Sequence, residues 1–133
     1  MNVPNDTEVE ANGNLYVPDE ANNRVLIFLN PSDTSAPCPD HTKPGCAGDV
    51  VADMVLGQGA SGNDFGSSAP GVGPTAMNAP VSVRVDANGK LFVSDDLNNR
   101  VLMFLAPLDT GAPCPTPGQP GCAGDAIADA VFG

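Results

Sequence analysis

Apolar and polar residues alternate along residues 81–85, which read VSVRV, and a period of two is typical of a half-buried β-strand. The DANG segment that follows is a turn signal, and it leads into a second apolar stretch at 90–94. Another turn, DDLNN, precedes RVLMFL at 100–105, and a long loop separates this stretch from AIADAVF at 126–132. The pattern predicts four short strands joined in sequence order, which is a four-stranded antiparallel meander.

The same pattern occurs twice in the chain. Residues 1–57 align without a gap on residues 77–133, a period of 76, and 34 of the 57 aligned positions carry identical residues. Residues 58–76, which are rich in Gly, Ser, Ala and Pro, connect the two copies. We therefore expect a first repeat at 1–57, a connector at 58–76 and a second repeat at 77–133.

The first copy departs from the strand pattern near its start. It has Asn5, Asp6, Thr7 and Glu8 where the second copy has the alternating residues 81–84. We expect this strand to be irregular or exposed, because the polar residues remove the alternation. The chain also starts and stops at repeat boundaries, which favours either a segment of a longer array or a protomer that self-assembles.

Composition favours strands and turns over long helices. The 133 residues include 15 Gly and 14 Pro and no Trp, and 41% are hydrophobic, which is enough for a folded, turn-rich protein. A single four-stranded sheet has two faces to cover, and stacking repeated sheets covers both. The predicted fold is all-β, with two four-stranded antiparallel sheets stacked as the blades of a propeller. A sandwich made from the two repeats is the alternative.

Two nineteen-residue strings carry a family resemblance. Residues 10–28, EANGNLYVPDEANNRVLIF, and residues 86–104, DANGKLFVSDDLNNRVLMF, resemble the NHL repeat of β-propeller proteins. In that repeat a D-x-x-G-N-L-Y-V-x-D turn and strand precede N-x-R-V and a hydrophobic strand. The resemblance implies blades around a central channel, although the long loop and the connector make this repeat longer than compact propeller repeats. It also implies a polar framework that ties neighbouring strands or blades, made of Asp19, Asn23, Arg24, Asp95, Asn99 and Arg100.

Each repeat carries two cysteines in its long loop, with seven residues between them. Pairing within a repeat is the economical arrangement, and it joins Cys38 with Cys46 and Cys114 with Cys122. In the chain-entropy model such a short ring contributes roughly 2.6 kcal/mol. The alternative is a structural zinc site, which normally has four Cys or His ligands, whereas each loop has two cysteines and only one loop has a histidine, His41. Disulfides favour an extracellular or periplasmic location.

The chain is acidic, with sixteen Asp and Glu against five Lys and Arg and a formal net charge of -11. Nucleic acid is not an expected partner, because this charge repels phosphate backbones and the basic residues are scattered. No apolar run has the length of a membrane span, so we expect no membrane-spanning segment in this chain. The first residues also lack the pattern of a signal peptide, which would then lie outside this chain.

The residue sets of common catalysts are missing from the sequence. It has one His, no G-x-S-x-G motif and no phosphate-binding loop, so we expect no catalysis and no cofactor. Calcium is a weaker possibility, because D-x-N-G resembles the opening of a calcium loop and oxygen ligands are offered by Asp86, Asn88, Asp95 and Asp96. The later acidic ligand of such loops is absent, and an Asp-Asn-Gly hairpin turn explains the same residues without a metal.

The leading functional prediction is a non-catalytic, secreted NHL-type propeller module that acts as a structural or interaction scaffold. Its partners would be other propeller repeats or copies of itself, because two blades do not close a ring. Further repeats in a longer chain, or self-assembly into a closed ring or a filament, would complete it. One alternative is a two-blade fragment of a propeller lyase, lactonase or similar hydrolase whose catalytic residues lie outside this chain. Another is a carbohydrate or cell-surface binding module, for which Phe65 is the obvious aromatic candidate.

Overall fold

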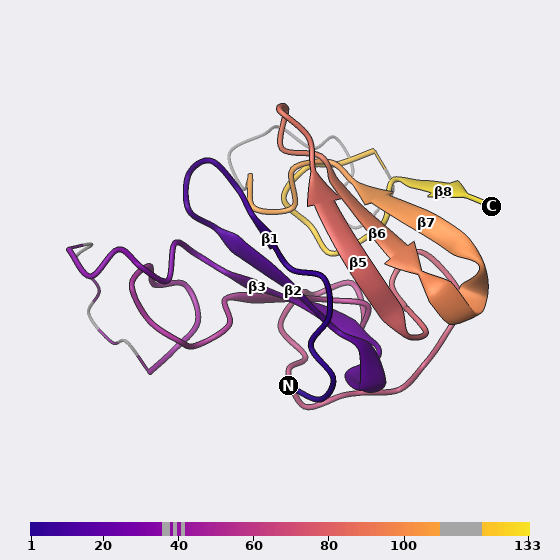
Figure 1. Cartoon of the computed structure of the whole chain (residues 1–133), viewed down its shortest axis with the longest axis horizontal. Helices are drawn as coiled ribbons and strands as arrows, with labels where there is room; N and C mark the ends of the chain where they lie inside the picture. Colours follow the sequence, from indigo (N-terminus) through magenta and orange to yellow (C-terminus); the bar gives the residue numbers. More distant parts are fainter. Residues whose placement is uncertain (36–37, 39, 41, 110–120) are drawn as a thin grey trace.

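The computed structural model describes residues 1–133 except 36–37, 39, 41 and 110–120. The described residues form two antiparallel four-stranded sheets, each with its strands in sequence order (Figure 1). The first sheet contains β1 (Glu8–Val9), β2 (Leu15–Asp19), β3 (Arg24–Phe28) and β4 (Met54–Leu56), and the second contains β5 (Pro80–Val85), β6 (Leu91–Asp95), β7 (Arg100–Phe104) and β8 (Ala130–Phe132). The prediction of an all-β chain with two four-stranded antiparallel sheets is confirmed.

Short turns connect the second and third strands of each sheet. Each connection is a single 3-10 turn, η1 (Glu20–Asn22) in the first sheet and η2 (Asp96–Asn98) in the second. An asparagine in the left-handed conformation follows each turn. Asn23 has φ 55° and Asn99 has φ 52°, a region that asparagine tolerates better than most residues. The backbone therefore gives one reason why both copies have Asn at this position. The described residues contain no helix with the length and hydrophobicity that a membrane span requires.

The outermost strand of the second sheet is shorter than the predicted stretch 126–132. It covers Ala130–Phe132 only, because the backbone before it makes other bonds. The Ala128 N–H donates to the Pro74 carbonyl, and the side chains of residues 126–128 are buried although they lie in a loop. In the first copy β1 has only two residues, in keeping with the expected irregular strand.

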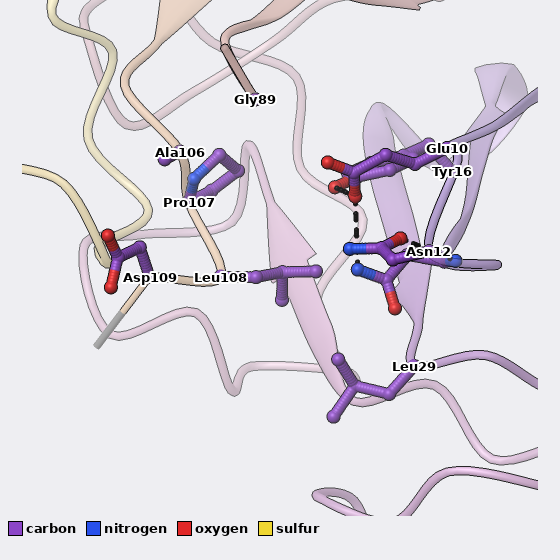
Figure 2. Close-up of a pocket in the computed structure, with 10 residues that line it drawn as sticks. Glu10, Asn12, Tyr16, Leu29, Gly89, Ala106, Pro107, Leu108 and Asp109 are labelled. Carbon is purple, nitrogen blue, oxygen red and sulfur yellow. Dashed lines mark hydrogen bonds between the residues drawn. The ribbon is translucent and has the colours of Figure 1, made fainter. Parts of the chain in front are cut away.

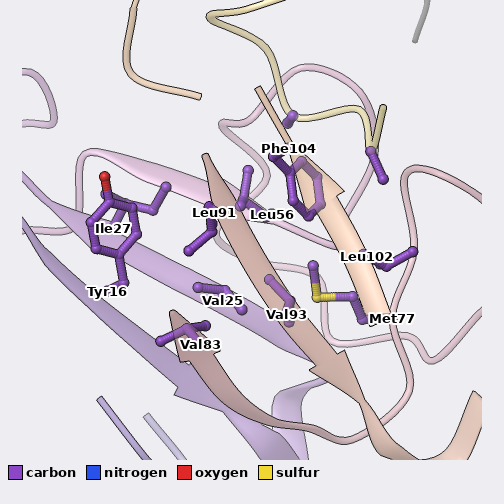
Figure 3. Packing of buried hydrophobic residues seen from close by; sticks show 12 residues of the cluster. Tyr16, Val25, Ile27, Leu56, Met77, Val83, Leu91, Val93, Leu102 and Phe104 are labelled. Atoms are coloured by element: carbon purple, nitrogen blue, oxygen red, sulfur yellow. The ribbon is translucent and has the colours of Figure 1, made fainter. Parts of the chain in front are cut away.

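The two sheets pack different faces against each other. The main core cluster takes Tyr16, Val25, Ile27 and Leu56 from the first sheet and Val83, Leu91, Val93, Leu102 and Phe104 from the second (Figure 3). Neighbouring residues of a strand point to opposite faces. With the repeat period of 76, Val25 corresponds to Val101, and Leu102 corresponds to Leu26. The first sheet therefore buries one face of the repeat and the second sheet buries the other face, so the units are stacked head to tail.

The other face of the first sheet has its own apolar cluster. Val17, Leu26, Phe28 and Val55 are buried there, and Leu15, Ala52 and Phe65 pack against them. Phe65 comes from the connector, whose backbone also pairs with β4, since the Val55 N–H donates to the Gly62 carbonyl over 2.9 Å. The connector thus covers part of the first sheet as well as linking the repeats.

Head-to-tail stacking makes a direct prediction for two valines at the same repeat position. Val25 is 0% exposed in the core between the sheets, whereas Val101 is only partly buried on the outer face of the second sheet. We expect Val25→Ala to lower the free energy of unfolding by about 2 kcal/mol, because it loses buried methyl groups and leaves a cavity. Val101→Ala should cost less than half as much. Urea unfolding of the two variants measures both values, and equal losses would contradict the stacking.

Candidate interaction site

A buried carboxylate organises the corner of the first unit. Asp19 ends β2 with its side chain fully buried, and the Arg24 Nε donates to its Oδ2 over 2.9 Å. Its Oδ1 accepts the Asn2 backbone N–H over 2.5 Å, and Asn22 donates its side-chain amide to both oxygens. Arg24 also donates from Nη1 to the Phe65 carbonyl over 2.6 Å, and this bond ties the connector to the corner.

The second unit repeats this corner at the equivalent positions. Arg100 donates from Nε to the Asp95 Oδ2 over 2.7 Å, and its Nη2 donates to the carbonyls of Gly73 and Ala76. The Asn78 N–H donates to Asp95 Oδ1 over 2.6 Å, and the Asn98 side chain donates to Oδ2. The structure therefore brings Asp19 together with Arg24, and Asp95 with Arg100. Charge-assisted bonds of this kind are among the stronger ones in proteins.

Two opposing effects act on the pKa of the Asp19 carboxyl. Burial alone would raise the pKa, but the hydrogen bonds from the Asn2 N–H, Asn22 and Arg24, together with the charge of Arg24, outweigh it. The pKa is lowered from its ordinary value of 3.8. The ionised carboxylate is therefore the form that stabilises the corner.

Asparagine at the corner joins one unit to the next. The Asn23 Oδ1 accepts the backbone N–H of Ala79 over 2.9 Å, and its Nδ2 donates to the Ser68 carbonyl. Beside this bond the fully buried Met77 side chain lies against Gly57, where any β-carbon would meet the Met77 Cγ at 2.9 Å. This contact between residues of different repeats is the junction. Among the framework residues, Asn23 thus ties units together while Asp19 and Arg24 hold the corner within one unit.

The equivalent residues at the two ends of the described chain lack this junction. Asn99 is exposed, and no hydrogen bond of its side chain to another described residue is formed, whereas Asn23 is half-buried. Met1, the counterpart of Met77, is 68% exposed. Val3, the counterpart of Ala79, has the same φ of 55° and is 51% exposed. These three residues therefore take part in no junction within the described chain.

The long loop of the first unit is closed by the predicted disulfide. Cys38 and Cys46 are bonded, with their Cα atoms 5.5 Å apart, which rules out zinc ligation by these two sulfurs. The Asp53 carboxylate holds the loop on the sheet, because its Oδ1 accepts the N–H groups of Gly45 and Cys46 and its Oδ2 accepts that of Leu29 over 2.7 Å.

The second loop lies partly outside the described residues. The predicted bond between Cys114 and Cys122 lies outside the described residues, because Cys114 is not described. Within the described part, Asp129 repeats the role of Asp53: its carboxylate accepts the N–H groups of Leu105 and Gly121. No described cysteine is a free thiol.

A cleft of about 280 Å³ lies at the seam between the units (Figure 2). On its first-unit side the Glu10 carboxylate accepts bonds from the Tyr16 hydroxyl and the Asn14 amide, each over 3.0 Å. Burial, followed by the negative charge of Glu10, raises the pKa of Tyr16 far above its ordinary value, so this hydroxyl stays protonated. Leu108 and Asp109 line the other side in Figure 2. The described lining has no histidine, cysteine or serine that could serve as a nucleophile.

The calcium candidates lie in two separate places. Asp86 and Asn88 belong to the β5–β6 hairpin, where the Asp86 Oδ1 accepts the N–H groups of Asn88 and Lys90. These bonds lower the pKa of Asp86 and account for the hairpin turn, as the alternative proposed. Asp95 and Asp96 lie at the far end of β6, so the strand separates the two pairs. Calcium binding stays a prediction.

One group of described side chains has metal-ligand spacing, Cys38, Cys46 and Asp49, but its two sulfurs are joined in the disulfide. Phe65, the aromatic candidate for carbohydrate binding, is partly buried against the first sheet. Sequence reasoning missed Asn22, Asn98, Asp53 and Asp129. Their identity in both copies was the available signal, because a polar residue repeated in a loop usually holds the backbone in place.

No protein-family model matches this chain, and no curated protein matches it either. The resemblance to the NHL repeat therefore stays a prediction from the quoted motifs.

The Asp19 corner predicts a pH dependence of stability. A carboxyl whose pKa is lower in the folded state stabilises the fold above its unfolded pKa, and this contribution is lost as the pH falls through the folded value. The free energy of unfolding should decrease below about pH 4, and Asp19→Asn should show a smaller decrease than the wild type. Urea unfolding at pH 7 and pH 3 measures this, with Asp96→Asn as a control that removes the same charge at an exposed site. An identical decrease in Asp19→Asn and the wild type would contradict the role of Asp19.

The junction predicts different effects for the two asparagines. Glycine keeps the left-handed conformation and removes only the side-chain amide. We expect Asn23→Gly to lower the free energy of unfolding by about 1 kcal/mol, because the bonds to the Ala79 N–H and the Ser68 carbonyl are lost, and Asn99→Gly to cost much less. Thermal or urea unfolding at low protein concentration compares them, and the reverse order would disprove the junction.

Proposed function

We propose that this chain is a non-catalytic, secreted NHL-type β-propeller repeat module that acts as a structural and interaction scaffold, completed by further units of the same repeat. The observation that carries the proposal is that the two units bury opposite faces against each other. A contact between unlike faces leaves one outer face at each end of the stack, and such contacts can in general be continued or closed into a ring. In this chain the outer face of the second sheet is the open one, because Phe65 covers part of the outer face of the first sheet. A contact between like faces would instead end with two units.

The burial of equivalent residues supports this arrangement. Leu56 is 0% exposed at the stacked face, while its counterpart Phe132 is 53% exposed. Val9 is 64% exposed, while its counterpart Val85 packs against the main core. Each pair has an apolar residue in both copies, but only one member is covered. A further unit on either end would cover the other member.

The disulfide loops fit a scaffold outside the reducing cytosol. The Cys38–Cys46 bond closes a loop rich in Pro and Gly, and the Asp53 carboxylate fixes that loop to the end of β3. A disulfide is compatible with an extracellular or periplasmic protein. The loops of successive units would project in a row from the stack and provide the surface for interaction.

A chain with a third unit tests the proposal. We would add a second copy of residues 58–133 after Gly133 and measure urea unfolding. The added junction buries the outer face of the present second unit, so the free energy of unfolding should rise by at least about 2 kcal/mol. The control is the same three-unit chain with Val101→Glu in its middle unit, which places a charge in the new junction. The proposal is wrong if the three-unit chain is no more stable than the two-unit chain.

A further inference from the structure

We propose that the cleft at the seam between the two units binds a primary alkylammonium group, of the kind carried by a lysine side chain or a small aliphatic amine. The cleft measures about 280 Å³, which suits a single side chain or a small molecule. Its first-unit wall is polar, and its second-unit wall is mainly apolar (Figure 2). The inference goes beyond the proposed function, because the cleft lies within one chain and needs no further unit.

The Glu10 carboxylate supplies a negative charge on the polar wall. Its Oε2 accepts the Tyr16 hydroxyl and the Asn14 side-chain amide, each over 3.0 Å. Asn14 is only 8% exposed and its Oδ1 accepts the Asn30 N–H, so this amide is fixed in place. The Glu10 Oε1 forms no hydrogen bond with a described residue, and a β-carbon at Gly89, across the cleft in Figure 2, would lie 3.9 Å from it. One oxygen of a fixed carboxylate is therefore available to a ligand.

The basic residues of the chain are engaged elsewhere. Four of the five form ion pairs with other carboxylates: Arg24 with Asp19, Lys43 with Asp40, Arg84 with Asp6 and Glu8, and Arg100 with Asp95. The fifth, Lys90, belongs to the hairpin of the second unit. The described lining of the cleft contains no Lys or Arg. No cation of the described chain therefore balances the charge of Glu10 in the cleft.

The second copy of the repeat has a cation at the equivalent position. Glu10 corresponds to Asp86, and Asn14 corresponds to Lys90. The hydrogen bond from the Lys90 N–H to Asp86 is the main cause of the lowered pKa of Asp86, and the charge of Lys90 contributes to it. The first copy keeps a carboxylate at this position but has no lysine beside it. An ammonium group from outside would supply to Glu10 the charge that Lys90 supplies to Asp86.

The number of available oxygens favours an ammonium group over a guanidinium group. A guanidinium binds a carboxylate best through both of its oxygens, but the Glu10 Oε2 already accepts two hydrogen bonds. An ammonium group is compact and needs only one oxygen. The net charge of -11 also attracts a cationic ligand to the protein.

The apolar wall suits the aliphatic stem of such a ligand. Leu29, Pro107 and Leu108 line the cleft, and Leu108 also packs against the main core cluster. In the first copy the residue that corresponds to Leu108 is the polar Ser32. Lysine side chains often place their stems on apolar surface while the charged end stays in a polar environment. The two walls together therefore match a charged end joined to an aliphatic stem.

Titration of the isotope-labelled chain with n-butylammonium, followed by amide NMR, tests the inference. The shifts should concentrate in the residues that line the cleft, and the binding should weaken as the salt concentration rises. n-Butanol has the same stem without the charge, and it should bind at least about tenfold more weakly. n-Butylguanidinium should also bind more weakly than n-butylammonium, because it needs a second oxygen.

Variants of the two walls locate the binding site. Glu10→Gln removes the charge but keeps an acceptor for Tyr16 and Asn14, and it should weaken n-butylammonium binding at least about tenfold. Glu20→Gln is the matched control: it makes the same change in η1, at the other end of β2, and should bind as the wild type does. Leu108→Ser places the residue of the first copy in the apolar wall and should weaken binding by about threefold.

Asn14→Lys provides a second test that leaves the carboxylate in place. It gives the first copy the lysine of the second copy, so an internal ammonium would compete with the ligand for Glu10. We expect it to weaken n-butylammonium binding about as much as Glu10→Gln does. Unchanged binding in a folded Asn14→Lys chain would contradict the inference.

A lysine with both backbone ends blocked, Nα-acetyl-lysine methylamide, identifies the source of the ammonium group. Binding at least as tight as that of n-butylammonium indicates a lysine side chain of a partner protein, and binding of n-butylammonium alone indicates a small free amine. The inference is wrong if n-butylammonium shifts no resonance of the cleft, if n-butanol or n-butylguanidinium binds as tightly, or if Glu10→Gln binds as well as Glu20→Gln. Such results leave the proposed function standing, because the three-unit chain tests stacking and not the cleft.

Discussion

Each sheet in this protein has two apolar faces, and the contact between the sheets buries one face of the first sheet against the opposite face of the second. The faces are different surfaces: one presents Tyr16, Val25 and Ile27, and the other presents Val17, Leu26 and Phe28. Strand alternation keeps the two sets apart, so no rotation of side chains can exchange them. The main core, the exposed valines and the junction bonds all depend on this pairing of unlike faces.

Carboxylates hold the parts of the chain that are neither strand nor apolar core. Asp19 and Asp95 accept N–H groups from the segment that enters each unit, and Asp53 and Asp129 accept N–H groups from the end of a strand and from the long loop. The chain contains 15 Gly and 14 Pro residues, and many of its backbone donors therefore lie outside regular structure. Buried donors without partners would be costly, so these acidic side chains satisfy a need that sheets cannot meet.

Much of the fold could be predicted from local pattern, and the site only in part. Alternation and turn residues predict β5, β6 and β7 closely, because adjacent side chains and turn conformations determine them. β8 is shorter than predicted because Ala128 bonds to Pro74, a residue far away in the sequence. The resemblance to the NHL repeat implies a framework that includes Asp19, Arg24, Asp95 and Arg100, but the choice of stacked face depends on how two twisted sheets meet. No local pattern contains that information.

Asn23 and Asn99 occupy the same repeat position and share a backbone conformation, but their side chains make different contacts. The left-handed backbone explains an asparagine at both Asn23 and Asn99, but glycine would meet that need equally well. The amide of Asn23 bonds to the Ala79 N–H and to the Ser68 carbonyl, whereas no hydrogen bond within the described chain uses the amide of Asn99. Met1 and Met77 differ in the same way: Met77 is buried against Gly57 at the internal junction, whereas Met1 is exposed. The repeat therefore keeps these residues at both positions, although only the members at the internal junction make the contacts.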